Sequence, residues 1–125
     1  MEYSPEVVRR FDAPRGAGEL PHGTPGLVSG EAFDRSLHVW VRFDLQVTDG
    51  VIQTARFQAF GCPHTVAAAD LAVEWLLGQP FEAVNKIEAK RLATALDVPV
   101  EKLGKLLRIE DAAAACWRSA AATRK

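Results

Sequence analysis

Cys62 is the residue of this 125-residue chain whose type and position most clearly allow chemistry. It stands between Gly61 and Pro63, where an alternating segment ending at Phe60 gives way to a helical pattern that stops at Gly78. At a helix entrance, unpaired backbone N–H groups and the positive end of the helix dipole favour a thiolate over a thiol. Cys62 is therefore a candidate metal ligand or nucleophile, and the alternative is a small buried apolar side chain.

Two histidines are candidate partners for this thiol. His64 follows Cys62 by two residues, and His38 opens the first long alternating segment, so either ring could reach a metal ion near Cys62 if the turns allow it. The alternative for His64 is a solvated residue of the first helical turn. The second cysteine, Cys116, lies inside a helical Ala-rich run, and we expect it in the core.

Length and composition predict a single domain over residues 1–125. Hydrophobic residues make up 48% and charged residues 25%, which is typical of globular proteins. Fifteen basic and sixteen acidic residues give a formal charge of −1, so we expect neither nucleic acid nor a membrane as a partner. The start lacks the pattern of a secretory signal and no long apolar run occurs, so we expect a cytoplasmic protein with free thiols.

The first half of the chain predicts a helix, a loop and a hairpin. Ser4 and Pro5 suit the N-cap and first position of a short helix, and residues 13–26 are rich in proline and glycine, as loops are. Leu27-Val28 predicts a short edge strand before Ser29-Gly30. Alternation from Leu37 to Val47, the turn signal Asp49-Gly50 and the segment Val51 to Phe60 predict two long antiparallel strands.

Trp40 interrupts the alternation of the first long strand. It places a large aromatic side chain on the face that is otherwise polar. A contact surface and a cover provided by the amino-terminal loop both explain such a residue.

The second half predicts helices only. One pattern runs from Phe81 to Leu96 with a change of phase around residues 85–88, and Asp97-Val98-Pro99 ends it. Pro99 then opens a short helix through Leu107, and a last helix runs from Ile109 to Ala122. The predicted fold class is α+β, with a small antiparallel β-sheet of about three strands packed against the C-terminal helices.

Short motifs along most of the chain carry a resemblance to one family. In order, they are Tyr3-Ser4, Pro14-Arg15, Asp49-Gly50-Val51-Ile52, Phe60-Gly61-Cys62, Glu74-Trp75, Val98-Pro99 and Glu110-Asp111-Ala112. The chain in this respect resembles the IscU/NifU amino-terminal family of iron–sulfur cluster assembly scaffolds. The resemblance implies a three-stranded antiparallel sheet packed against helices, in agreement with the periodicity.

The resemblance also implies a site with three cysteines, an aspartate and a histidine. Cys62 matches the middle cysteine. Phe33 aligns with the first cysteine, and Asp34 is the nearby residue that could stand for the aspartate. Gly104 and Lys105 fall at the histidine and the third cysteine, so a ligand is replaced by a cation with no lone pair to donate.

We therefore predict that Cys62 is the cluster-binding residue and that Asp34 and His64 are further metal ligands. The predicted function is that of a scaffold-like protein, not an enzyme, which binds iron or an iron–sulfur cluster weakly or with a partner's help. The cargo implied is an iron–sulfur cluster or zinc, with a metal-free protein as the alternative. The partners implied are a cysteine desulfurase or other assembly proteins, with a homodimer also open.

Two other functions stay open at this point. The first is an adaptor that keeps the scaffold fold and docks on assembly proteins without holding a cluster. The second is a thiol enzyme in which the helix entrance, with Lys105 or His64, activates Cys62.

Overall fold

The computed structural model describes residues 3–123. Its helices and strands are, in chain order, α1 (Pro5–Asp12), β1 (Leu27–Asp34), β2 (Val39–Thr48), β3 (Val51–Phe60), α2 (Pro63–Leu76), the 3₁₀ helix η1 (Phe81–Asn85), α3 (Ala89–Leu96), the 3₁₀ helix η2 (Val100–Lys102) and α4 (Leu103–Thr123). Within the described residues, no helix is sufficiently long and apolar to cross a membrane.

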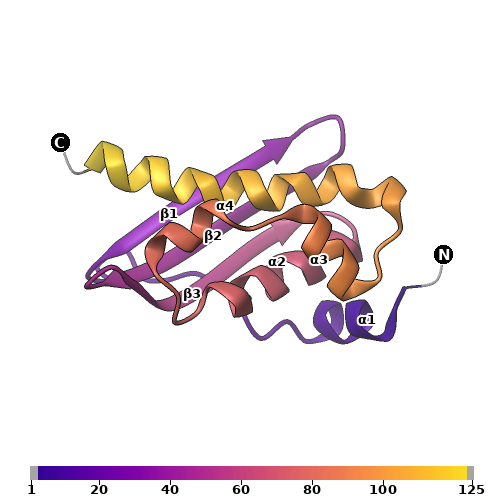
Figure 1. The fold of residues 1–125 in the computed structure, drawn as a ribbon, viewed down its shortest axis with the longest axis horizontal. Coiled ribbons are helices and arrows are strands. Elements are labelled where there is room, and N and C mark those ends of the chain that lie inside the picture. Colours follow the sequence, from indigo (N-terminus) through magenta and orange to yellow (C-terminus); the bar gives the residue numbers. More distant parts are fainter. Residues whose placement is uncertain (1–2, 124–125) are drawn as a thin grey trace.

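The three strands form one antiparallel sheet in the order β1-β2-β3, which confirms the predicted α+β class. Helices α2 and α4 lie on one face of the sheet, and α1 packs on α2 (Figure 1). The side chains of β2 that face these helices are fully buried, namely Val39, Val41, Phe43 and Leu45. The other face of the sheet, which we call the open face, carries the alternate residues.

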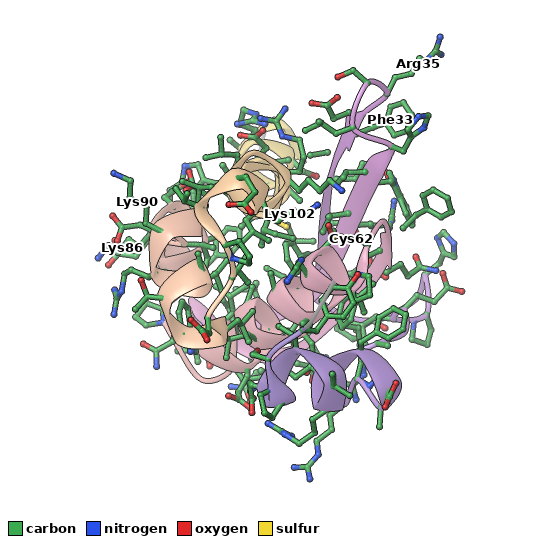
Figure 2. The ribbon with its side chains drawn as sticks, turned by 90° about the vertical axis from the view of Figure 1, so that its right-hand side faces the viewer. Phe33, Arg35, Cys62, Lys86, Lys90 and Lys102 are labelled. Atoms are coloured by element: carbon green, nitrogen blue, oxygen red, sulfur yellow. The ribbon has the colours of Figure 1, made fainter. Side chains whose placement is uncertain are left out.

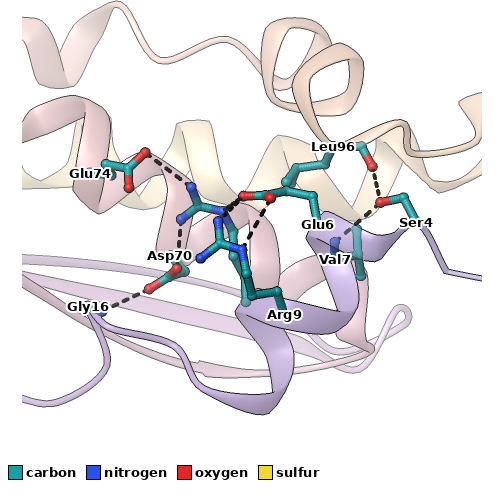
Figure 3. Close-up of polar contacts among 9 residues, drawn as sticks. Ser4, Glu6, Val7, Arg9, Gly16, Asp70, Glu74 and Leu96 are labelled. Carbon is teal, nitrogen blue, oxygen red and sulfur yellow. Dashed lines mark hydrogen bonds and ion pairs between the residues drawn. The ribbon is translucent and has the colours of Figure 1, made fainter.

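The first helix begins as predicted. Ser4 is its N-cap and accepts a hydrogen bond from the Val7 backbone N–H at 3.2 Å, with Pro5 in the first helical position. The same hydroxyl donates to the Leu96 carbonyl at 2.6 Å, which ties α1 to the end of α3 (Figure 3).

A buried ion pair fixes α1 against α2. Arg10 Nη1 lies 2.8 Å from Asp70 Oδ2, and the two residues are 6% and 4% exposed. The other oxygen of Asp70 accepts from the Gly16 backbone N–H at 2.8 Å, and Glu6 and Glu74 occupy further donors of the guanidinium (Figure 3). Every charge of this network has a partner, as a buried ion pair requires.

The prediction of a short strand at Leu27-Val28 is wrong in length, because β1 continues to Asp34 and pairs with β2 throughout. The misleading residue is Gly30, which breaks the apolar pattern but serves packing. A Cβ atom at Gly30 would lie 2.4 Å from the backbone nitrogen of Cys116, so only glycine lets α4 cross β1 this closely.

Three other predicted boundaries are also wrong. The second strand begins at Val39 instead of Leu37, because a turn at residues 35–38 precedes it, with His38 at φ 54°. The pattern from Phe81 to Leu96 is divided into η1 and α3. The two helices predicted after Pro99 are one, since η2 leads directly into a continuous α4.

The segment 13–26 contains no helix or named strand, as predicted. It instead follows the outer edge of β3, where the Phe57 N–H donates to the Gly16 carbonyl at 2.9 Å and the Gly18 N–H donates to the Phe57 carbonyl at 2.8 Å. It then reaches the open face, where the Leu20 N–H donates to Asp44 at 3.0 Å. The loop therefore protects a strand edge.

Candidate functional site

Cys62 lies at one end of the sheet, directly after β3. It is the N-cap of α2 with extended backbone (φ −76°, ψ 168°), and it is partly exposed. Its carbonyl accepts from the Thr65 N–H at 2.9 Å, and its Sγ lies 3.8 Å from the Thr65 hydroxyl. The predicted position at a helix entrance is thus present in the structure.

The surroundings of Cys62 favour the thiolate. Burial opposes ionisation, but the Thr65 backbone N–H and hydroxyl and then the His64 backbone N–H favour the charged sulfur. The Lys105 ammonium adds a smaller attraction from α4. The net effect lowers the pKa of Cys62 below its usual value.

Cys116 has the opposite environment. It is fully buried in α4, as predicted, and burial followed by the Asp44 carboxylate raises the pKa of its thiol to about 12. Cys116 is therefore a core residue with no access to reagents.

This contrast predicts selective thiol chemistry. Iodoacetamide at neutral pH should alkylate Cys62 and leave Cys116 unmodified in the folded protein, as peptide mass spectrometry would show. Lys105→Met should slow the alkylation of Cys62 because it removes the nearby positive charge, whereas Lys90→Met should leave the rate unchanged. Equal modification of both thiols would contradict the assignment.

His64 is buried, with 1% of its surface exposed. Its ring contacts Tyr3 edge-on with the centroids 4.8 Å apart, and its Nδ1 has no hydrogen-bond partner among residues 3–123. Burial, followed by the positive charges of Lys102 and Lys105, lowers the pKa of His64. His64 thus offers a neutral nitrogen in the interior, and its role as a ligand stays a prediction.

The buried imidazole predicts a loss of stability in mild acid. Because the folded state disfavours the imidazolium, the unfolded chain binds the proton more readily below about pH 6.5. The free energy of unfolding should be constant above that value and fall as the pH decreases through it. Urea unfolding across this range should show the fall for the wild-type protein and for the exposed-loop control His22→Gln. If the free energy of unfolding of His64→Gln fell by as much as that of the wild type, the buried imidazole would not be the cause of the loss.

Asp34 lies at the end of β1, and its carboxylate is already engaged. Oδ1 accepts from the Ser36 hydroxyl at 2.7 Å and from the Leu37 N–H at 3.1 Å, and Oδ2 pairs with Arg108 at 3.5 Å. The Ser36 and Leu37 hydrogen bonds, with Arg108, keep the pKa of Asp34 below its usual value. Strand β2 separates the strand that ends at Asp34 from the strand that precedes Cys62.

The remaining positions that the resemblance aligns with family ligands carry no metal-binding side chain in this chain. Phe33 pairs with Trp40 across the sheet and lies on the open face, away from the helices. Gly104 faces open space, and Lys105 is the cation near Cys62. His38 lies in the exposed turn before β2, where its N–H donates to the Arg35 carbonyl at 3.2 Å.

Within the described residues 3–123, no group of three or more His, Cys, Asp and Glu side chains could hold a metal ion. Iron–sulfur clusters usually take four thiolate ligands. One thiolate beside an ammonium does not fit that requirement, so the described residues do not form a complete cluster site.

Two residues near Cys62 and Asp34 are missed by the sequence analysis. Thr65 stands three positions after the N-cap, a spacing at which a hydroxyl can contact the capping side chain, and this signal was available. Arg108 pairs with both Asp34 and Asp111. The Asp111 pair follows from helical spacing, but the pair with Asp34 joins α4 to β1 and has no sequence signal.

Comparison with known proteins identifies the protein family to which this fold, with Cys62 at the end of its sheet, belongs. The model of the NifU-like N-terminal domain family matches residues 2–121, so the chain belongs to that family. It is 29% identical over 119 residues to the iron-sulfur cluster assembly scaffold protein IscU of Azotobacter vinelandii, covering 94% of this chain and 93% of the relative. It is 33% identical over 114 residues to iron-sulfur cluster assembly protein 3 of Arabidopsis thaliana, covering 88% of this chain and 65% of the relative.

Solved structures show the same fold. The N-terminal NifU-like protein from Brucella abortus superposes with a TM-score of 0.69 at 16% identity, over 92% of this chain and 91% of that one. An iron-sulfur cluster assembly scaffold protein for the SUF system from Fervidobacterium islandicum gives 0.57 at 16% identity, over 94% and 85%. These likenesses confirm the predicted architecture, and the family model confirms the predicted family.

Proposed function

We propose that this chain takes part in iron–sulfur cluster assembly as a scaffold-like protein that holds iron or a cluster through Cys62 only when a partner supplies the other ligands. The proposal is supported by Cys62 at the entrance of α2, where the pKa of its thiol is lowered and no group of three donors surrounds it among residues 3–123; the resemblance aligns it with a family ligand. An incomplete donor set with an activated thiol suits a shared site.

The partner must bring soft donors, because a cluster or a zinc ion prefers sulfur. A cysteine desulfurase or another assembly protein meets this requirement, and so does a second copy that contributes its own Cys62. In this proposal the chain is a single domain, works in the cytoplasm and catalyses no reaction itself. Asp34 and His64 would act as additional ligands only after Arg108 releases Asp34 and His64 is exposed.

A second function is supported by a separate observation. Arg108 already neutralises Asp34, and Lys105 already lies near Cys62, so these two candidate ligands have cationic neighbours without a metal ion. This favours an adaptor that docks on assembly proteins and carries no cluster.

Purification without oxygen separates the two functions. The protein should be isolated from its source cell with its partners, and its iron, zinc and labile sulfide measured. The proposed function predicts metal in the complex that is lost in Cys62→Ser and retained in the core control Cys116→Ala. A complex with assembly proteins but without metal would establish the adaptor instead, and neither metal nor assembly proteins would exclude both.

A further inference from the structure

Three aromatic side chains form a row across the open face of the sheet. Phe33 pairs with Trp40, and Trp40 pairs with Phe60, so directly opposed residues place the three rings on the same face. Phe33 and Phe60 are 62% and 66% exposed, and Trp40 is partly exposed. Exposed aromatic side chains that adjoin one another mark interaction sites more often than single ones.

The fold does not account for this aromatic row. The next residues on the open face form a polar network in which Arg42 pairs with Glu31 at 3.7 Å and with Asp44 at 3.1 Å. The amino-terminal loop makes its hydrogen bonds to this face farther along the strands, at Asp44 and Gln46. Trp40 is held by a hydrogen bond from its indole N–H to Glu31 at 3.2 Å, so the row is also preorganised.

Among the described residues, three cationic side chains near this end of the molecule have no carboxylate partner, whereas Glu31 and Asp34 there pair with Arg42 and Arg108. Figure 2 shows Arg35 projecting from the β1–β2 turn and Phe33 from the adjoining end of β1, with Cys62 and Lys102 at the same end. In the described part of the chain, Arg35, Lys102 and Lys105 form no ion pair with a carboxylate. A partner that covers this end therefore gains by bringing acidic residues.

We propose that the aromatic row is the docking surface for a protein partner that presents apolar side chains among acidic residues. Buried aromatic side chains cover about 150–250 Å² each. Three of them supply less than the roughly 800 Å² per partner of a stable interface, so the partner must extend past the row to the cations. A second copy of this chain would bring the same unpaired cations into the contact, and their repulsion disfavours it.

The position of the row has a consequence for Cys62. Phe60 precedes Cys62 by two residues, so a partner seated on the row has its own side chains beside the thiolate. This part of the inference rests on the proposed function, because it makes the docked partner the source of the missing ligands.

A peptide selection tests the docking surface without assuming the partner. A random-peptide phage library is selected on the wild-type protein, and the selected peptides are then measured against Phe33→Ala/Phe60→Ala and against Phe11→Ala, a matched change of an exposed phenylalanine on α1. We expect peptides rich in Asp or Glu with Leu, Phe or Trp, which bind the double variant at least about tenfold more weakly than the wild type and bind the control as tightly as the wild type.

Arg35→Glu should weaken the binding of these peptides as well, and Lys86→Glu should not. Peptides that are not acidic, or that bind the double variant equally, would overturn the proposal, as would a concentration-dependent dimer that the double variant abolishes.

Binding to a purified cysteine desulfurase then separates this inference from the proposed function. If the peptides bind through the aromatic row but the protein does not bind the desulfurase, the docking surface is retained and the desulfurase is not the partner. If the protein binds the desulfurase and holds iron through Cys62, and the double variant changes neither, the proposed function is retained and the docking surface is overturned. Thermal unfolding of each variant confirms that it is folded, as expected for the double variant, since Phe33 and Phe60 are 62% and 66% exposed.

Discussion

Replacing Asp70 by alanine is expected to lower the free energy of unfolding by about 3–5 kcal/mol, because it leaves Arg10 charged and buried without its buried carboxylate partner. The guanidinium lies 2.8 Å from the Asp70 carboxylate, and both residues are almost fully buried. The same change removes the acceptor of the Gly16 N–H, at 2.8 Å, and so also frees the loop that protects β3.

The measurement is urea unfolding followed by circular dichroism. Glu74→Ala is the matched control, since the Glu74 side chain is 62% exposed and contacts the same guanidinium, so its removal should cost less than about 1 kcal/mol. A double variant, Arg10→Met/Asp70→Leu, should regain most of the stability, because removing both charges leaves no uncompensated one. Equal losses for Asp70→Ala and Glu74→Ala would show that the buried pair does not hold α1 in place.

Replacing Lys105 by cysteine is expected to increase zinc affinity by more than about 100-fold, since loss of an outer-shell partner alone changes metal affinity 10–100-fold. The change removes a cation that repels the ion and adds a second thiolate at the position that the resemblance aligns with the third cysteine of the family. Gly104→His/Lys105→Cys should bind more tightly still, because it adds an imidazole.

Competition with a chromophoric chelator measures the affinity of each protein. Lys90→Cys is the control, since it adds a thiol on α3 away from Cys62, and it should bind zinc no better than the wild type. If Lys105→Cys matched Lys90→Cys, the placement of Lys105 beside Cys62 would be wrong. If Cys62→Ser left the gain intact, the two thiolates would not share one ion.

The elements with a strong local signal could be predicted from the sequence. Ser4 and Pro5 define the start of α1, and Asp49-Gly50 defines the hairpin between β2 and β3. The Cys62 helix entrance also follows from local pattern, because Gly61 and Pro63 stand on either side of it. Each of these signals lies within a few residues, and no distant contact is needed to interpret it.

The elements that depend on distant contacts could not be predicted from the sequence. The strand β1 continues through Gly30 because α4 needs the space that a side chain would fill. The engagement of Asp34 depends on Arg108, which comes from α4. The burial of His64 depends on Tyr3, far away in the sequence, so a histidine in a first helical turn that looks solvated lies in the interior.

The aromatic row is an intermediate case. The alternation places Trp40 on the polar face, but Phe33 falls outside the strand that the sequence predicts. Only the observed register brings Phe33, Trp40 and Phe60 into line. The contact surface that the sequence leaves as one of two explanations for Trp40 thus becomes a specific proposal once β1 has its full length.

Anaerobic reconstitution with iron and sulfide tests most directly the central claim, that Cys62 supports a cluster only together with a partner's ligands. The visible charge-transfer absorption and the bound iron and labile sulfide should be measured for the chain alone and for its complex with a cysteine desulfurase. We predict a colourless, iron-free chain alone and a coloured complex, with the colour lost in Cys62→Ser. A stable coloured cluster on the isolated monomer, or a complex whose colour survives Cys62→Ser, would contradict the account.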